Sequence, residues 1–298
     1  MKKKSKIKNS FLNFHNLALP VKIFLIFMFV YFLLLAAIHV IPFLVVINNS
    51  LKTAAEIRDS MMAITKSWSF NNYAEMFKLF KVNGSVGFGE MLFNSLWQTF
   101  VYLFINLLSS MLVAYTMSKY RFPGRGILFG LMIFTQTIPI IGTGAAGYKL
   151  RYALNMVNNP SLIWFSWAMG FDYSAFIMYV TFNTVSNTYM EAAEIDGGGP
   201  ATIFFKVMLP QIFPVIIALM VTNFVGKWND YTTAQIYLNK YPNLAYGAYV
   251  FEQSSRFLAN AKGVYYAVLL VVAVPGVLIY AFTQSFIMKN VSVGGIKG

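Results

Sequence analysis

The sequence lacks cysteine and contains only two histidines, His15 and His39, in 298 residues. Without cysteine the chain can form no disulfide framework, no thiolate-bound cluster and no thiol nucleophile. Two isolated histidines cannot form the HExxH pattern of zinc hydrolases, and no GxxxxGK(S/T) sequence is present to form a P-loop for ATP. We therefore expect no catalytic residue, no bound metal and no cofactor in this chain.

Charged side chains are also scarce. They make up 11% of the chain, whereas 58% is hydrophobic and the mean hydropathy is +0.60. The apolar residues gather in six runs, each close to the roughly 20 residues that a membrane-spanning helix requires. The sequence therefore predicts an all-α membrane protein with six transmembrane helices, at residues 21–47, 93–117, 126–147, 161–183, 212–236 and 263–287.

The net charge of +13 lies mostly beside these runs, which indicates membrane anchoring rather than nucleic-acid binding. The first run is too long for the core of a signal peptide, so we expect it to remain as a span. The prediction is one transmembrane domain, residues 21–288, between an N-terminal tail, 1–20, and a C-terminal tail, 289–298. Both tails and the basic turn Lys119–Arg125 are expected in the cytoplasm.

The same topology places a loop, residues 184–214, on the cytoplasmic side. Residues 191–214 carry three carboxylates, three consecutive glycines and three prolines. Thr188 and Glu191 fit a capping box, which predicts a short helix up to Asp196 with Gly197 as its left-handed stop. A second helix, Ala201–Met208, is expected to begin at Pro200 and to end at Pro210.

Two interpretations of this loop stay open, a solvated connection and a docking element for a soluble partner. Asp196 lies at the end of a helix, where the helix dipole disfavours an anion. The neighbouring Ala192 and Ala193 present a bare surface that permits close approach by another backbone. Unpaired acids beside small residues favour a basic docking partner.

The segment resembles the EAA motif of the permease subunits of ATP-binding-cassette importers. The motif runs without a gap, and Gly198 stands where alanine is common. Other stretches, among them FNNYAEMF, AYTMSKYRFPGR and KWNDY, are similar to carbohydrate importers of the maltose-transporter type. The residues assigned to the motif are Glu191, Ala192, Ala193, Glu194, Asp196, Gly197, Leu209 and Pro210.

This resemblance implies the fold of a type I importer permease in a bacterial cytoplasmic membrane, with half of a translocation pathway for a sugar or oligosaccharide. In that family the loop is a coupling helix that sits in a groove of an ATPase subunit. The implied partners are a second permease subunit, two ATPase subunits that bind ATP and Mg, and an extracytoplasmic sugar-binding protein, together with the lipid bilayer.

Polar and aromatic residues at membrane depth are the candidates for contact with the substrate. Aromatic rings stack on the C–H faces of pyranoses and amides bind hydroxyls, but Trp and Tyr also gather as belts at membrane interfaces. Lys227 and Asp230, three residues apart, could instead pair with each other. The candidate residues are Asn223, Trp228, Asn229, Asp230, Tyr231, Trp164, Trp167 and Asp172.

The alternatives to an importer subunit are a self-contained secondary transporter and an intramembrane enzyme. A secondary transporter of the common kind would carry a repeat pair and buried ion-coupling residues. An intramembrane enzyme would carry paired acids or a metal-binding set within the spans. The sequence shows neither pattern, and Asp172 has no evident second acid.

Overall fold

A computed structural model of the chain describes residues 17–137, 144–168, 170–255 and 262–291. Regular structure in this part is helical, apart from one isolated β-bridge between Val82 and Val86. Most of the tails, 1–16 and 292–298, and residues 138–143 of the third expected span lie outside the described residues. The predicted all-α class is confirmed for the described part.

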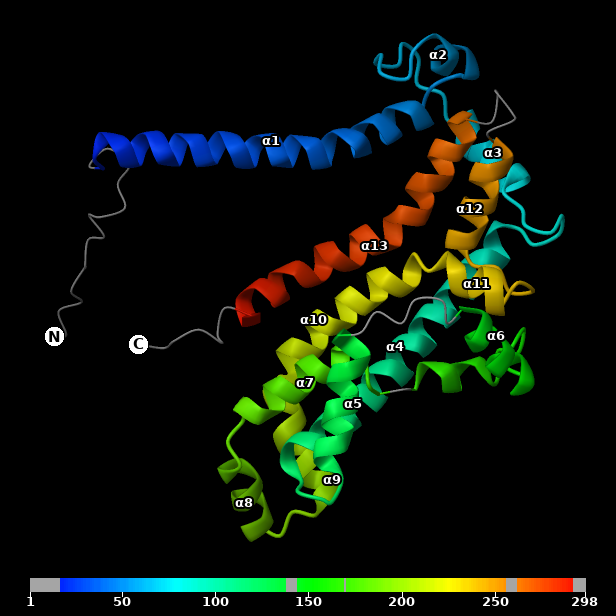
Figure 1. Cartoon of the computed structure of the whole chain (residues 1–298). Helices are drawn as coiled ribbons and strands as arrows, with labels where there is room; N and C mark the ends of the chain where they lie inside the picture. Colours follow the sequence, from blue (N-terminus) through cyan, green and yellow to red (C-terminus); the bar gives the residue numbers. More distant parts are fainter. Residues whose placement is uncertain (1–16, 138–143, 169, 256–261, 292–298) are drawn as a thin grey trace.

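Among the described residues, four helices are long and apolar enough to cross a membrane. They are α1 (Leu19–Ser50), α4 (Phe88–Lys119), the helix Pro200–Trp228 and the first 24 residues of α13 (Lys262–Val291). They overlap the first, second, fifth and sixth predicted spans, and most of their ends differ from the expected ones by a few residues. Figure 1 shows α4, α10 and α13 running side by side through the body of the molecule.

The helices in the third and fourth predicted spans are much shorter than expected. There, α5 (Arg125–Thr137) has 13 residues and α7 (Tyr173–Thr184) has 12, below the ~20 residues of a full span. Between them lie α6 (Gly144–Ala153) and a short 3₁₀ helix, η3 (Ile163–Trp167). The six-span count thus remains a prediction.

The fifth span differs from its prediction at both ends. Pro210 does not end a helix, because α9 (Pro200–Thr202), a π-helical segment η4 (Ile203–Met208) and α10 (Leu209–Trp228) follow one another without a break. The π-helical turns place Pro210 in the first turn of α10, where its missing amide is tolerated. At the other end the helix stops at Trp228 rather than at residue 236, and α11 (Tyr231–Tyr237) begins separately.

Two apolar clusters hold these helices together. The first joins α3 (Asn71–Leu79), α4, α10, α12 (Leu244–Ser255) and α13 around Trp228, which is 1% exposed and donates its Nε1 proton to the Val272 carbonyl at 2.8 Å. The second joins α4, α7, η4 and α10 around the Tyr115 ring. Because α4 and α10 belong to both clusters, these two helices form the centre of the fold.

The first helix, α1, lies outside both clusters. It contacts α13 near its own C-terminal end, and its most apolar stretch is 0% buried within this chain. Figure 1 shows it extending away from the other helices. His39 Nδ1 donates a 2.7 Å hydrogen bond to the Leu35 carbonyl, so its ring is held by its own helix. A helix that is apolar all round suits a lipid or protein environment rather than water.

The segment between α1 and α4 folds over the ends of α1 and α13. Thr53 and Glu56 form a capping box at the start of α2 (Ala54–Asp59), with the Thr53 amide 3.0 Å from the Glu56 carboxylate. The Lys66 amide donates to the same carboxylate at 2.9 Å. The amides of Lys66 and Thr53 hold the pKa of Glu56 below its usual value, because they bind the charged form.

Close packing at Gly247 provides a test of this core. A Cβ at Gly247 would lie 2.5 Å from the Met91 Sδ atom and 2.9 Å from the Phe80 ring, whereas a Cβ at Gly276 of α13 would meet no atom within 4 Å. We expect Gly247→Ala to lower the free energy of unfolding by about 1–3 kcal/mol through overpacking. Gly276→Ala should be neutral or stabilising. Thermal unfolding in detergent measures both, and equal melting temperatures would contradict the packing described here.

Candidate functional site

The EAA segment forms α8 (Thr188–Ile195), a short helix at one extremity of the molecule (Figure 1). The predicted capping box is wrong, because Asn187 rather than Thr188 is the N-cap and no side chain caps the first turn. The Thr188 hydroxyl instead shares a 2.9 Å hydrogen bond with the Ser186 hydroxyl. The helix therefore starts one residue earlier than expected.

The end of α8 agrees with its prediction. Gly197 has a φ of +80°, the left-handed conformation expected of a helix stop. The Gly197 amide donates to the Glu194 carbonyl at 3.0 Å and the Gly198 amide to the Ala193 carbonyl at 2.8 Å, which is the Schellman pattern. A Cβ at Gly198 would lie 2.8 Å from the Ala193 carbonyl oxygen, so both glycines suit this turn.

One face of α8 is exposed to the surroundings of the described chain. Glu191, Ala192, Glu194 and Asp196 are exposed, and Ile195 is 86% exposed. None of the three acids has an ion-pair partner among the described residues. The other face carries a half-buried Ala193 beside Met190, packed against the second apolar cluster. The two alanines of the motif thus face opposite ways.

A lysine holds the start of this segment in place. Lys119, at the end of α4, donates from Nζ to the Val185 carbonyl at 2.6 Å and to Asn187 Oδ1 at 2.9 Å. These two bonds tie α4 to the turn between α7 and α8. Further along the motif, Leu209 is half-buried in the second cluster and Pro210 is exposed, both in the first turn of α10.

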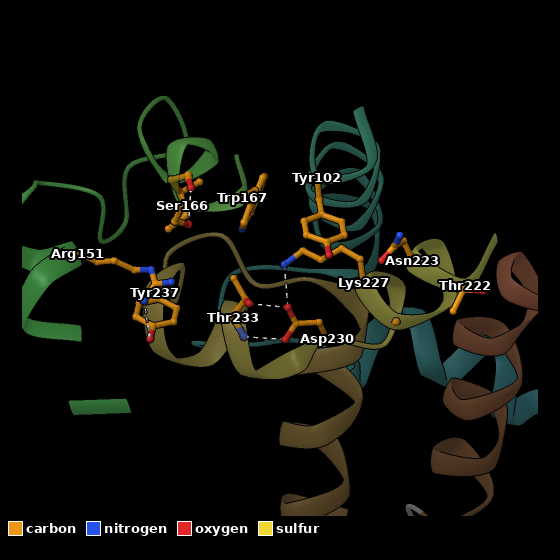
Figure 2. Close-up of a pocket in the computed structure, with 12 residues that line it drawn as sticks. Tyr102, Arg151, Ser166, Trp167, Thr222, Asn223, Lys227, Asp230, Thr233 and Tyr237 are labelled. Atoms are coloured by element: carbon orange, nitrogen blue, oxygen red, sulfur yellow. Dashed lines mark hydrogen bonds and ion pairs between the residues drawn. The ribbon is translucent and has the colours of Figure 1, made fainter. Parts of the chain in front are cut away.

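A pocket of about 290 Å³ opens beside the C-terminal end of α10 (Figure 2). Five elements supply its walls, namely α4, α6, η3, α10 and α11. Aromatic rings, amides, hydroxyls and charged groups share the lining. The residues are Tyr102, Arg151, Ile163, Ser166, Trp167, Thr222, Asn223, Gly226, Lys227, Asp230, Thr233 and Tyr237.

An ion pair stands in the wall of this pocket. Lys227 Nζ lies 2.8 Å from Asp230 Oδ2, which bears out the pairing expected from their spacing. The same ammonium lies 4.8 Å from the centre of the Trp167 ring and 5.3 Å from that of Tyr102. Aromatic faces attract a cation, so a carboxylate and two rings together compensate the loss of water around Lys227.

Asp230 also joins α10 to α11. Its Oδ1 accepts a hydrogen bond from the Thr233 amide at 2.9 Å, which caps α11, and its Oδ2 accepts from the Thr233 hydroxyl. The Asp230 carbonyl accepts from Asn243 Nδ2 at 2.9 Å. The carboxylate is therefore occupied by groups of this chain (Figure 2).

Three of the eight residues proposed for substrate contact, Trp167, Asn223 and Asp230, line this pocket. Asn223 donates from Nδ2 to the Ser174 hydroxyl at 2.8 Å. Trp164 stacks on the adjacent Phe165 ring and is packed in the small cluster that adjoins the pocket. Contact of these residues with a substrate stays a prediction.

The other four lie elsewhere. Trp228 is in the core between α10 and α13. Asn229 and Tyr231 line a separate, mostly apolar groove beside α1, α12 and α13. Asp172 is the N-cap of α7, and the structure does not place it in the lining of the pocket.

Asp172 accepts hydrogen bonds from three donors. Asn106 Nδ2 and the Ser110 hydroxyl, both from α4, lie 2.8 Å from its carboxylate oxygens. The Ala175 amide lies 2.9 Å away. A carboxylate at this depth requires such donors, and here they fix the start of α7 against α4.

Sequence reasoning missed several residues of the pocket, notably Tyr102, Arg151, Thr233 and Tyr237. Tyr102 lies in a long apolar run and carries no local signal. Arg151 is a cation in an aromatic stretch, and this pattern could have marked it as a candidate site residue. Its partner Tyr237, whose ring centre lies 4.6 Å from the guanidinium carbon, is too distant in sequence to recognise.

A model of the family described as binding-protein-dependent transport system inner membrane component matches residues 106–290, more than half of the chain. The chain belongs to this family. The matched range includes all of α8 and its Gly197 stop, so the kinship expected from residues 191–214 is confirmed.

The sequence similarity of this inner membrane component to its relatives covers almost its whole length. The diacetylchitobiose uptake system permease protein NgcG of Streptomyces coelicolor is 28% identical over 89% of this chain and 86% of its own. The arabinooligosaccharides transport system permease protein AraQ of Bacillus subtilis is 22% identical, with 90% and 94% covered. The maltodextrin transport system permease protein MalD of Streptococcus pneumoniae is 23% identical, with 91% and 94% covered.

Solved structures match the fold of this inner membrane component. A chain of a bacterial ABC transporter involved in the import of the acidic polysaccharide alginate superposes with a TM-score of 0.76 at 20% identity, over 90% of this chain and 98% of that one. A chain of a bacterial alginate ABC transporter in complex with an alginate pentasaccharide-bound periplasmic protein superposes with a TM-score of 0.54 at 13% identity. The match covers 74% of this chain and 84% of that one. The chain thus has the fold of an ABC importer permease.

The ion pair predicts a pattern of stabilities. Lys227→Met should lower the free energy of unfolding, because Asp230 then remains without its cation. Breaking a buried ion pair costs about 3–5 kcal/mol, and we expect a loss near the lower end of that range. The double variant Lys227→Met with Asp230→Asn should recover much of this loss, since no charge is left. Thermal unfolding of the purified protein checks this. A double variant less stable than Lys227→Met would show that the charges do not compensate each other.

Proposed function

We propose that this chain is the permease subunit of an ATP-driven importer and forms half of a translocation pathway for a sugar or oligosaccharide. The observation that carries the proposal is α8, in which the EAA segment forms a surface helix with an exposed acidic face. Lys119 ties this helix to α4, and the second apolar cluster ties it to α7 and η4. A solvated connection would need neither attachment.

The residues on the exposed face of α8 are suited to docking by a partner, which supports a role in coupling. Ile195 and Tyr189 are 86% and 51% exposed, and burial of such apolar surface by a partner is favourable. Glu191 and Glu194 beside them would form charge-assisted bonds with basic groups of the partner. Ala192 leaves this face flat enough for close approach. We infer that the partner is an ATPase subunit.

The remaining partners follow from what this chain does not carry. Because it has no P-loop sequence, ATP and Mg belong to two separate ATPase subunits. A second, related permease subunit would complete the pathway, and an extracytoplasmic sugar-binding protein would deliver the substrate. The relatives are named for diacetylchitobiose, arabinooligosaccharides and maltodextrin, which supports a carbohydrate substrate.

The pocket beside α10 is the proposed stretch of the pathway in this chain. The rings of Trp167, Tyr102 and Tyr237 provide faces for a pyranose, and Asn223 and Ser166 provide hydrogen-bonding groups. The helix that carries Asn223 starts next to α8 and ends at the pocket. One continuous helix therefore connects the proposed ATPase contact with the proposed substrate contact.

We further propose six membrane crossings in a bacterial cytoplasmic membrane, with both termini and α8 in the cytoplasm. The basic residues near Lys119–Arg125 support this orientation. In this arrangement α5 and α7 cross together with the segments next to them, because neither is long enough alone.

The Gly197 stop gives the sharpest test of coupling. Gly197→Val should reduce co-purification of the ATPase at least about tenfold, because a branched side chain disfavours the left-handed conformation and re-aims α8. Gly199→Val is the matched control, since Gly199 is extended, with a φ of −71°, and has no atom within 4 Å of an added Cβ. Co-purification from the complete complex and transport-coupled ATP hydrolysis in proteoliposomes are the measurements.

Two further variants act on the exposed face alone. Glu191→Lys reverses a charge and Ala192→Trp adds bulk, and both leave the packed Ala193 side unchanged. Each should lower ATPase binding while the chain still inserts in the membrane. The coupling role would be refuted if all three variants kept full ATPase binding and transport, because α8 would then be only a connection. These variants are Gly197→Val, Glu191→Lys and Ala192→Trp.

The chain has no cysteine, which permits a direct test of orientation. In intact cells an impermeant thiol reagent should label Ser254→Cys but not Arg121→Cys, both at exposed positions. After permeabilisation both should be labelled. The reverse pattern in intact cells would refute the proposed topology.

A further inference from the structure

We infer that the pocket beside α10 takes a saccharide that carries a carboxylate, a uronic acid unit, and that Arg151 binds this carboxylate. The inference rests on the proposed function, because it specifies the class of sugar that the chain would pass. It follows from the balance of charge in the pocket, from the free donors of Arg151 and from the aromatic lining around them.

The charged groups of the lining do not cancel. Lys227 and Arg151 are cations, and Asp230 is the one carboxylate among the lining residues. Both carboxylate oxygens of Asp230 already accept hydrogen bonds, from Lys227 and Thr233, at the junction between α10 and α11. The pocket therefore keeps one unit of positive charge in excess, and that charge lies on Arg151.

Arg151 is held in position but is not neutralised. Its Nη1 lies 3.3 Å from the Tyr237 hydroxyl and 3.4 Å from the Gly147 carbonyl, both long hydrogen bonds. Its guanidinium carbon lies over the Tyr237 ring at 4.6 Å. No described carboxylate forms an ion pair with it. A guanidinium has five donors in a planar fork, so enough remain for a two-point contact with a carboxylate.

The positions of the other groups fit a sugar ring next to that carboxylate. Figure 2 shows Arg151 and Tyr237 at one side of the pocket, with Trp167 and Ser166 between them and the Lys227 pair. Trp167 is 7% exposed, so its ring is anchored. The volume of about 290 Å³ is at the small end of ligand sites, which suits one sugar unit at a time.

A single excess charge favours a uronate over a phosphorylated sugar. A carboxylate carries one negative charge, whereas a phosphate monoester carries close to two near neutral pH. One free guanidinium balances the first but not the second. A neutral sugar would leave the cation without a counter-ion when water is expelled from the pocket, which is unfavourable.

The test compares probes that differ in one group. The complex of the two permeases and the two ATPase subunits in lipid nanodiscs, without the sugar-binding protein, is titrated with three probes. They are trigalacturonate, the neutral trisaccharide of galactose that has the same linkages, and a phosphorylated form of that neutral trisaccharide. Calorimetry at low ionic strength measures the affinities. We expect trigalacturonate to bind at least about tenfold more tightly than the neutral probe, an effect of the size of one charge-assisted contact.

Substitutions locate the contact. Arg151→Gln should remove most of the preference for the acidic probe, and Arg151→Lys should keep part of it, because the charge stays while the fork is lost. Arg58→Gln is the matched control, an exposed arginine of α2 outside the pocket, and should keep the full preference. An unchanged melting temperature of Arg151→Gln confirms that its fold is intact.

Equal affinity for acidic and neutral probes, or an Arg151→Gln variant with an unchanged preference, would overturn this inference. Tighter binding of the phosphorylated probe than of trigalacturonate would overturn the assignment to a carboxylate. In each case the proposed function stands if the reconstituted complex still takes up any oligosaccharide with ATP hydrolysis. The proposed function fails only if no sugar is taken up by a fully assembled complex.

Discussion

The hydrogen bonds that Asp172 accepts hold the centre of the molecule together. The first turn of α7 has free amides that need acceptors, and the Asp172 carboxylate supplies one while it accepts from Asn106 and Ser110 of α4. In a bilayer such groups cannot turn to water, so each must find its partner within the protein. A separate bond, from Asn223 of α10 to the Ser174 hydroxyl, joins the first turn of α7 to α10.

With α4, α7 and α10 fixed to one another, both candidate sites acquire their positions. At the far end of α7 the carbonyl of its C-cap, Val185, accepts a hydrogen bond from Lys119 of α4, and α8 starts just after this junction. Near the other end of α10, Tyr102 of α4 and Trp167 of η3 close around Lys227. The helix α8 and the pocket are thus attached to the same frame of three helices.

Apolar runs and local turn chemistry were sufficient to predict part of this structure. The long helices and the Gly197 stop depend on neighbours in sequence, and there the predictions hold. Asp172 was noticed as an acid at depth, but its role depends on Asn106, which is 66 positions away. The continuity of the helix through Pro210 depends on a π-helical segment for which no local pattern was evident. The pocket combines five elements, so only Trp167, Asn223 and Asp230 of its lining were expected to contact a substrate, and Lys227 was expected as the partner of Asp230.

The unbroken helix Pro200–Trp228 has a mechanical consequence. Its 29 residues give a rod roughly 40 Å long, and a rod of that length transmits a tilt at one end as a displacement at the other. The hydrogen bonding departs from that of a regular α-helix at the π-helical turns Ile203–Met208 and at Pro214, which lacks an amide. Bending would concentrate in this part of the helix, nearer to α8, while the remaining length moves as a lever whose far arm carries Lys227 and Trp228.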